Sequence, residues 1–319
     1  MAKQPNDQTN KELVLGSAMW GWTINRKSAF ALLDEFYTQG FRQIDAATNY
    51  PINKVPADFR RSEQILEEWI KANGIHDLSI MMKVGSISNM RTPDHNLKAS
   101  FLLLNWQQYA ARLGLNLGTM MIHWDNRAVE EEIQDSLNAL KTIAESGMAI
   151  GLSGIKNPQI YAHLLPLEER ALKIQIKHNL LYSDYPRYSD FHGKAAFYTY
   201  GINAGGMKIH KDHYHQQSSL KVRGGNTEQL HPAVEEVKSV FTQINSLQKW
   251  PNLSKMNEAA MNFAYYSSDI KGILIGPSRL EQLKDSIQFF KQLEEMDYAL
   301  FYQKLLKIHR TYAPEDRKI

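Results

Sequence analysis

Short apolar runs alternate with amphipathic stretches along most of the chain. The apolar runs predict strands at 13–20, 41–47, 78–84, 119–124, 149–155, 172–179, 199–205 and 270–276. Continuous apolar runs of this length are typical of strands that are buried on both faces. The pattern therefore favours a sheet enclosed by other elements over a sheet with one solvated face.

Between these runs, apolar residues recur at the spacing of an α-helix. Helices are predicted at 27–39, 62–71, 95–113, 129–145, 158–165, 233–247, 279–292 and 297–309. Gly40, Gly74 and Gly114 follow the first three, and Pro166 follows the fifth, as helix-ending signals. Strands that alternate with helices predict a parallel sheet. Eight such units predict an α/β protein of one domain, a closed (β/α)8 TIM barrel.

The doubly wound alternative is disfavoured, because no G-x-G-x-x-G follows the first predicted strand. We expect residues 1–12, MAKQPNDQTNKE, to be a flexible polar tail and residues 13–319 to form the barrel. Two connections, 49–61 and 206–232, are longer than the others. Both follow predicted strands and would lie over the C-terminal face, where they would cover substrate and cofactor. The alternative is that they are mobile insertions without contacts.

Composition narrows the function classes. Of 319 residues, 43% are hydrophobic and 22% charged, which is ordinary for a globular protein with a sizeable core. A net charge of +3 gives no argument for nucleic-acid binding. The chain has no cysteine, which excludes disulfides, thiolate catalysis and cysteine metal sites. With no long apolar run and no apolar N-terminal signal, we expect a soluble cytoplasmic protein without a membrane partner.

Four ionisable side chains stand where the predicted strands end. Asp45, Lys83 and His123 come at or near the ends of three apolar runs, and Tyr50 follows the first of these closely. The C-terminal ends of barrel strands meet at one face, where catalysis takes place. A structural ion pair would explain Asp45 and Lys83 alone, since a buried ammonium needs a partner. It would not explain the other two residues.

Together the four residues are suited to carbonyl reduction. A free phenol has a pKa near 10, and we expect the ammonium of Lys83 to lower the pKa of Tyr50 toward the working range. Asp45 would hold Lys83 in place. His123 would hydrogen-bond the substrate oxygen or assist proton transfer. Since no side chain carries a hydride, a nicotinamide cofactor must supply it.

The segments GFRQIDAATNY, IMMKVG, MMIHW and IGLSGI resemble the successive signature segments of the aldo-keto reductase superfamily. The likeness runs from about Leu13 to Ile287. It implies a (β/α)8 barrel that reduces carbonyls with NADPH, or occasionally NADH. The family's catalytic Asp, Tyr, Lys and His fall on Asp45, Tyr50, Lys83 and His123.

The resemblance also implies a set of cofactor contacts: Met19, Trp20, Ser153, Gly154, Gln175, Tyr200, Gly276, Ser278, Arg279 and Gln282. Two departures stand out. Gly154 replaces the asparagine that usually follows Ser153 in the family. The basic pair that many members place at the 2′-phosphate is reduced to Arg279, so we expect NADPH from the family's habit without excluding NADH.

Aromatic and histidine clusters complete the candidates. Trp22 and Trp124 are predicted to wall the substrate pocket, although core packing accounts equally well for Trp20 and Trp22. His210, His213 and His215 have donors suited to a metal, but a solvated loop is the favoured interpretation and we expect no metal site.

We therefore expect an NAD(P)H-dependent oxidoreductase that reduces an aldehyde or ketone, sugar-like or small and aromatic, with Tyr50 as proton donor. The same residues serve alcohol oxidation in reverse. The alternatives are a cofactor-binding regulatory subunit of the same fold without turnover and, on the same barrel, a metal-dependent hydrolase. The sequence leaves substrate, direction, oligomeric state and the role of residues 210–215 open.

Overall fold

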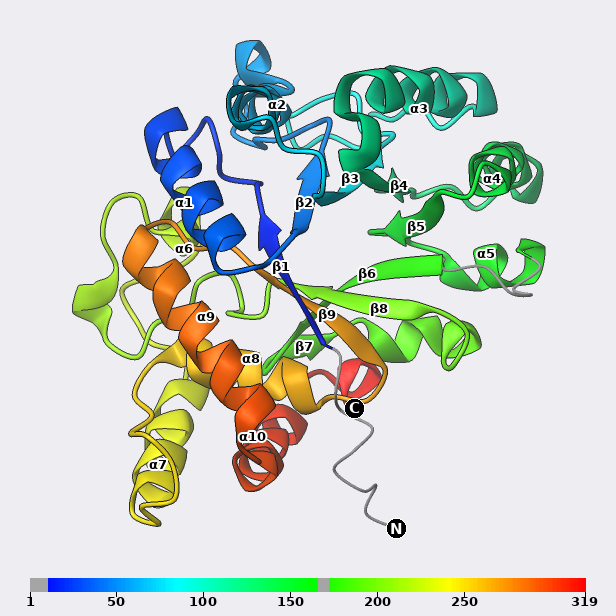
Figure 1. The fold of residues 1–319 in the computed structure, drawn as a ribbon. Helices are drawn as coiled ribbons and strands as arrows, with labels where there is room; N and C mark the ends of the chain where they lie inside the picture. Colours follow the sequence, from blue (N-terminus) through cyan, green and yellow to red (C-terminus); the bar gives the residue numbers. More distant parts are fainter. Residues whose placement is uncertain (1–10, 166–171) are drawn as a thin grey trace.

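The computed structural model describes residues 11–165 and 172–319. In these ranges eight parallel strands form a closed barrel (Figure 1). In barrel order they are β1 (Glu12–Gly16), β2 (Gln43–Ala47), β3 (Ser79–Val84), β4 (Leu117–His123), β5 (Ala149–Ser153), β6 (Leu172–Asn179), β8 (Ala196–Tyr200) and β9 (Ile270–Ile275). Strand β9 pairs with β1 and closes the barrel. The predicted (β/α)8 architecture is confirmed.

Helices surround this barrel (Figure 1). They are α1 (Arg26–Thr38), α2 (Arg61–Asn73), α3 (Ala99–Leu113), α4 (Glu130–Glu145), α5 (Pro158–Leu164), α6 (Ser219–Val222), α7 (Ala233–Asn245), α8 (Met256–Tyr266), α9 (Leu280–Glu295) and α10 (Ala299–Tyr312). A two-residue strand, β7 (Tyr182–Ser183), pairs antiparallel with the end of β6. Short 3-10 turns lie at Pro56–Asp58, Gly114–Asn116, Tyr185–Phe191, Lys211–His213 and Glu315–Arg317.

Alternate residues of each strand face the helices or the barrel interior. The outward residues, such as Ile44, Ile80 and Ile122, belong to the large hydrophobic core between strands and helices. The inward residues form a smaller apolar cluster: Val14, Met81, Met121, Tyr198 and Leu274. Nearer the C-terminal ends of the strands, the same inward-facing rows become polar at Asp45, Lys83, His123, Ser153 and Gln175. The interior of the barrel is therefore apolar in its middle and polar at the C-terminal ends of these strands.

Several element predictions need correction. The first strand ends at Gly16 rather than at residue 20, because a turn begins at Ala18. The seventh barrel strand is Ala196–Tyr200 rather than 199–205, because Gly201 leaves the strand in a left-handed conformation with φ of 65°. Helix α3 begins at Ala99 rather than near His95. Helix α8 was not predicted at all. Eight of its eleven residues are buried, so its apolar residues lie on most faces and do not give the one-sided pattern of an amphipathic helix.

The first described residue is Lys11, whose ammonium donates a hydrogen bond to the carbonyl of Ile270. Glu12 already begins β1. The rest of the predicted polar tail, residues 1–10, lies outside the described residues. None of the helices in the described ranges is both long and apolar enough to cross a membrane.

Candidate active site

A buried ion pair joins Lys83 of β3 to Asp45 of β2. The two residues are 1% and 3% exposed, so neither charge is compensated by bulk water. The side-chain amide of Gln175, on β6 across the barrel, donates a second hydrogen bond to Asp45 Oδ1 at 2.7 Å. The hydroxyl of Ser153 in turn donates to Gln175 Oε1 at 3.3 Å. One polar chain therefore links four strand ends.

Tyr50 and His123 meet beside this ion pair. Tyr50 follows β2, and its ring lies edge-on to the imidazole of His123, with the centroids 6.0 Å apart at an interplanar angle of 87°. The Nζ atom of Lys83 lies 5.0 Å from the centroid of the Tyr50 ring. The fold thus brings together all four residues that the sequence singled out as catalytic candidates.

The expected direction of the Tyr50 pKa shift was wrong. Burial is the largest cause and raises the pKa of the Tyr50 phenol well above its usual value of 10.0, and the carboxylate of Asp45 raises it further. The guanidinium of Arg223 acts in the opposite direction. The charge of Lys83 is largely offset at the phenol because Asp45 forms an ion pair with it. Tyr50 is consequently held as a protonated phenol.

His123 is held neutral. Burial, and then the charge of Lys83, lower the pKa of His123 well below its usual 6.5. Its Nδ1 atom is buried and has no hydrogen-bond partner among the described residues. The ring also packs against Trp124, with centroids 4.9 Å apart. A neutral imidazole at this place has one N–H to donate and one nitrogen to accept.

A cavity of about 830 Å³ opens over these side chains. Asp45, Tyr50, His123 and Gln175 line its inner end, and Lys83 lies behind Asp45. Loop residues complete the walls, among them Trp22, Ile52, Arg91, Thr92, Trp124, Asn126, Asn203 and Arg223. Both long loops noted in the sequence contribute, and so does a third loop between β3 and α3, where a helix was predicted to begin earlier.

A second cavity of about 520 Å³ adjoins the first. The two share lining residues Ile202, Asn203, Gly206, Ser219, Ile275 and Gly276. The predicted cofactor residues Gly276, Ser278, Arg279 and Gln282 line the second cavity. Lys208, which the sequence did not single out, lines it too, and burial together with the charge of Arg279 lowers the pKa of Lys208.

Trp124 packs against Gly154 and leaves no room for a side chain there. A Cβ atom at Gly154 would lie 2.5 Å from Cδ1 of the Trp124 indole, and Gly154 has φ of 69°. Trp124 is itself left-handed, with φ of 60°, and its backbone N–H donates to the Ser153 carbonyl at 2.9 Å. The indole thus occupies the space where a side chain at residue 154 would begin.

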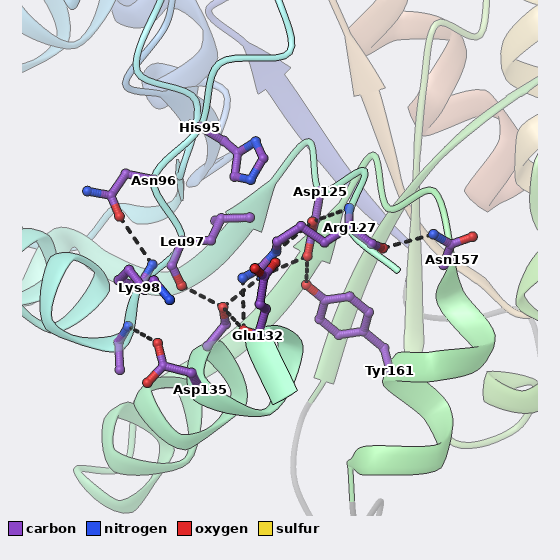
Figure 2. Close-up of polar contacts among 12 residues, drawn as sticks. His95, Asn96, Leu97, Lys98, Asp125, Arg127, Glu132, Asp135, Asn157 and Tyr161 are labelled. Atoms are coloured by element: carbon purple, nitrogen blue, oxygen red, sulfur yellow. Dashed lines mark hydrogen bonds and ion pairs between the residues drawn. The ribbon is translucent and has the colours of Figure 1, made fainter. Parts of the chain in front are cut away.

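A polar network fixes the segment that carries Trp124 (Figure 2). Arg127 donates two hydrogen bonds to Asp125, at 2.9 and 2.8 Å, and the hydroxyl of Tyr161 on α5 donates to the same carboxylate. Arg127 also donates to the hydroxyl of Ser136 on α4 at 2.8 Å. Asn157 donates to the Arg127 carbonyl at 2.8 Å. The network connects the segment after β4 to helices α4 and α5 and so fixes the position of this wall of the cavity.

Most predicted cofactor and substrate residues reach one of the cavities. Met19, Trp22, Trp124, Ser153, Gly154, Gln175 and Tyr200 line the first, and Gly276 lines both. Trp20 does not line either cavity, because its side chain is fully buried in the hydrophobic core. The sequence did not single out Arg91, Asn126, Lys208 or Arg223. Their only signal was a position in a loop that follows a predicted strand.

The histidine-rich loop lies beside the second cavity. His213 and His215 line this cavity, and the rings of His210 and His213 contact each other with centroids 5.2 Å apart. Across residues 11–165 and 172–319, no three His, Cys, Asp or Glu side chains are grouped closely enough to hold a metal ion.

Comparison with known proteins identifies a match over nearly the whole chain. The model of the Aldo/keto reductase family matches residues 12–305. Norsolorinic acid reductase stcV of Emericella nidulans is 29% identical over 157 residues, which are 44% of this chain and 38% of the fungal protein. An uncharacterized 11.2 kDa protein from the crtE 3′ region of Pseudescherichia vulneris is 33% identical over 94 residues, 29% of this chain and 82% of that protein.

The contact between Trp124 and Gly154 predicts a double-mutant result. Gly154→Ala introduces both a clash and a left-handed non-glycine residue, so we expect it to lower the free energy of unfolding by about 2–4 kcal/mol. In a Trp124→Ala background the clash is gone, and about 1 kcal/mol should remain. Urea unfolding of the four proteins measures the difference. An equal cost in both backgrounds would contradict the contact.

The neutral state of His123 predicts a pH dependence of stability. Below pH 6.5 the unfolded chain protonates this histidine while the folded chain does not, so the free energy of unfolding falls as the pH is lowered. Between pH 7 and 5 this amounts to about 2 kcal/mol. Urea unfolding of His123→Gln should therefore show a shallower decline than the native protein, by about that amount. Parallel declines would show that His123 titrates normally.

Proposed function

The chain belongs to the aldo/keto reductase family, and on this premise we propose that it reduces an aldehyde or ketone to the alcohol with a nicotinamide cofactor. Membership of this family supports an oxidoreductase activity. The finer proposal rests mainly on one observation: Tyr50 and His123 lie edge-on beside the buried Asp45–Lys83 pair at the inner end of a cavity. Those groups are the ones that carbonyl reduction requires.

The lining of the two cavities fits a bound dinucleotide. The carbonyl oxygen of the Asn203 side chain, at the junction of the cavities, is buried and has no hydrogen-bond partner among the described residues. A Cβ at Gly276 would meet nothing within 4 Å, so this strand end leaves open space on the wall that both cavities share. We assign the nicotinamide end to the side of the first cavity near Tyr200, Ser153 and Gln175. The adenosine end is assigned to the second cavity.

The protein's own residues would supply orientation and the proton. The nicotinamide, when bound, supplies the hydride that reaches the carbonyl carbon. The phenol of Tyr50 donates its proton to the carbonyl oxygen, and an N–H of neutral His123 donates a hydrogen bond to the same oxygen. A raised pKa does not prevent this step, since the alkoxide that develops is more basic than a phenolate. Arg223, whose charge lowers the pKa of the phenol, stabilises the phenolate that remains.

Two cations favour NADPH over NADH. Lys208 and Arg279 line the second cavity together, and neither forms an ion pair with a carboxylate in the described chain. Burial lowers the pKa of Lys208 and the charge of Arg279 lowers it further, so a phosphate that contacts both cations would be favourable. A 2′-phosphate would supply that anion. Lys208 thus takes the place of the second basic residue that the sequence motif lacks.

Tyr50→Phe tests the proton donor. The substitution removes the hydroxyl and keeps the ring, so we expect turnover of an aldehyde panel to fall by about 10²–10⁴-fold. The affinity for NADPH, followed by fluorescence titration, should stay nearly unchanged. Tyr37→Phe, at a tyrosine on α1 outside both cavities, is the matched control. If the native protein binds NADPH but turns over no carbonyl or alcohol, the chain is a cofactor-binding subunit and the proposed reduction is wrong.

Lys208→Ala tests the cofactor choice. Loss of one charge-assisted contact to a phosphate is expected to weaken NADPH binding about tenfold while NADH binding changes little. Lys211→Ala is the control, because Lys211 is in the same loop but lines neither cavity. Equal weakening of both cofactors would argue against a role for Lys208 at the 2′-phosphate.

A further inference from the structure

Two arginines line the first cavity without a carboxylate partner. Most arginines in the described chain are ion-paired: Arg26, Arg42, Arg60, Arg112, Arg127, Arg187 and Arg317. The others are Arg61, Arg91, Arg223, Arg279 and Arg310. Of these, Arg91 and Arg223 line the cavity above Tyr50, and Arg279 lines the second cavity. The unpaired arginines are thus concentrated where a ligand would lie.

The two side chains are anchored to the same turn after β1. The guanidinium of Arg91 lies 5.9 Å from the Trp22 ring, and its Nε donates to the carbonyl of Ile52 at 3.3 Å. Nη2 of Arg223 lies 3.4 Å from Sδ of Met19. Met19 and Trp22 are joined by a backbone hydrogen bond of 3.2 Å. Two loops far apart in the sequence therefore bring their cations to one wall of the cavity.

Arg91 and Arg223 are two like charges without an ion-pair partner among the described residues. Burial lowers the pKa of Arg223, with the charge of Arg91 lowering it further. Like charges held close together without an anion are unfavourable, and an oxyanion between them would relieve the repulsion. The planar guanidinium is suited to that role, since it forms paired hydrogen bonds to carboxylate and phosphate oxygens.

The 2′-phosphate does not explain this pair. The adenosine end and its 2′-phosphate are assigned to the second cavity, where Lys208 and Arg279 lie. Neither Arg91 nor Arg223 lines that cavity. Their neighbours in the first cavity are instead Trp22, Ile52 and Trp124, which are suited to the apolar part of a small substrate.

We propose that Arg91 and Arg223 form an anion subsite and that the substrate is a carbonyl compound carrying an oxyanion, either a carboxylate or a phosphate ester. The anion would lie against the two guanidiniums while the carbonyl oxygen reaches Tyr50 and His123. The inference rests on the proposed reduction and adds the class of substrate to it.

The test compares substrates matched in size that differ in charge. Full-length protein with NADPH is given 4-formylbenzoate, 4-formylphenyl phosphate and the neutral methyl 4-formylbenzoate. We expect kcat/KM for at least one anionic aldehyde to exceed that for the ester by about tenfold or more. The better of the two anions then identifies the source of the oxyanion. Equal kcat/KM for all three compounds overturns the subsite.

Arg91→Gln and Arg223→Gln locate the effect. Each is expected to lower the ratio of kcat/KM for the preferred anion to that for the ester by about tenfold. For Arg91→Gln the loss should come mainly through KM for the anion, whereas Arg223→Gln should also lower kcat with the ester, because Arg223 stabilises the phenolate of Tyr50. Arg310→Gln, at an unpaired arginine on α10 outside both cavities, should leave the ratio unchanged. A loss of NADPH affinity with an unchanged ratio would assign the arginines to the cofactor and overturn the proposal. Absence of turnover with every aldehyde, the ester included, would instead reject the proposed reduction itself.

Discussion

The site depends on one buried ion pair. Lys83 can point into the barrel only because Asp45, on the neighbouring strand, takes up its charge. An isolated ammonium in this interior would cost several kcal/mol. Gln175 reaches Asp45 from β6 across the barrel, so the pair also joins strands that share no backbone hydrogen bonds. Tyr50 and His123 rest against this group, and their positions follow from it.

The same ion pair sets the protonation states around it. Asp45 largely offsets the charge of Lys83 at the phenol, so burial dominates and the pKa of Tyr50 rises. The pKa of His123 falls for the same reason, with the charge of Lys83 as a second cause. The resting site therefore holds a protonated phenol beside a neutral imidazole, the forms that can donate hydrogen bonds to a carbonyl oxygen. Arg223, which has no carboxylate partner in the described ranges, lowers the pKa of the phenol and would favour the phenolate after proton transfer.

The barrel and the four catalytic candidates were predictable from the sequence because both depend on short-range pattern. Apolar runs mark buried strands, and the polar residue that ends a run must face the C-terminal rim. Arg91, Lys208 and Arg223 carry no such signal, since their loops have no periodicity and their positions are set by contacts with distant residues such as Met19 and Trp22. Helix α8 was not predicted for a related reason: it is buried on most faces, so its sequence lacks the one-sided apolar pattern of an amphipathic helix. The direction of the Tyr50 pKa shift was not predictable, because it depends on how deeply the phenol is buried and on where Asp45 and Arg223 lie around it.

Trp124, packed against Gly154, forms a wall of the cavity that the surrounding residues hold in place. A tryptophan with positive φ costs of order 1–3 kcal/mol and persists only where its surroundings over-determine it. Here they do, through the Ser153 carbonyl, the Arg127–Asp125 pair and the space that Gly154 leaves. Gly154 thus makes room for an aromatic wall that is fixed to the barrel. The arginines, in contrast, are carried by the loops between β3 and α3 and between β8 and α7. The catalytic candidates and the aromatic wall are therefore held at or next to the strand ends, whereas the charge preference of the site depends on arginines in the longer loops.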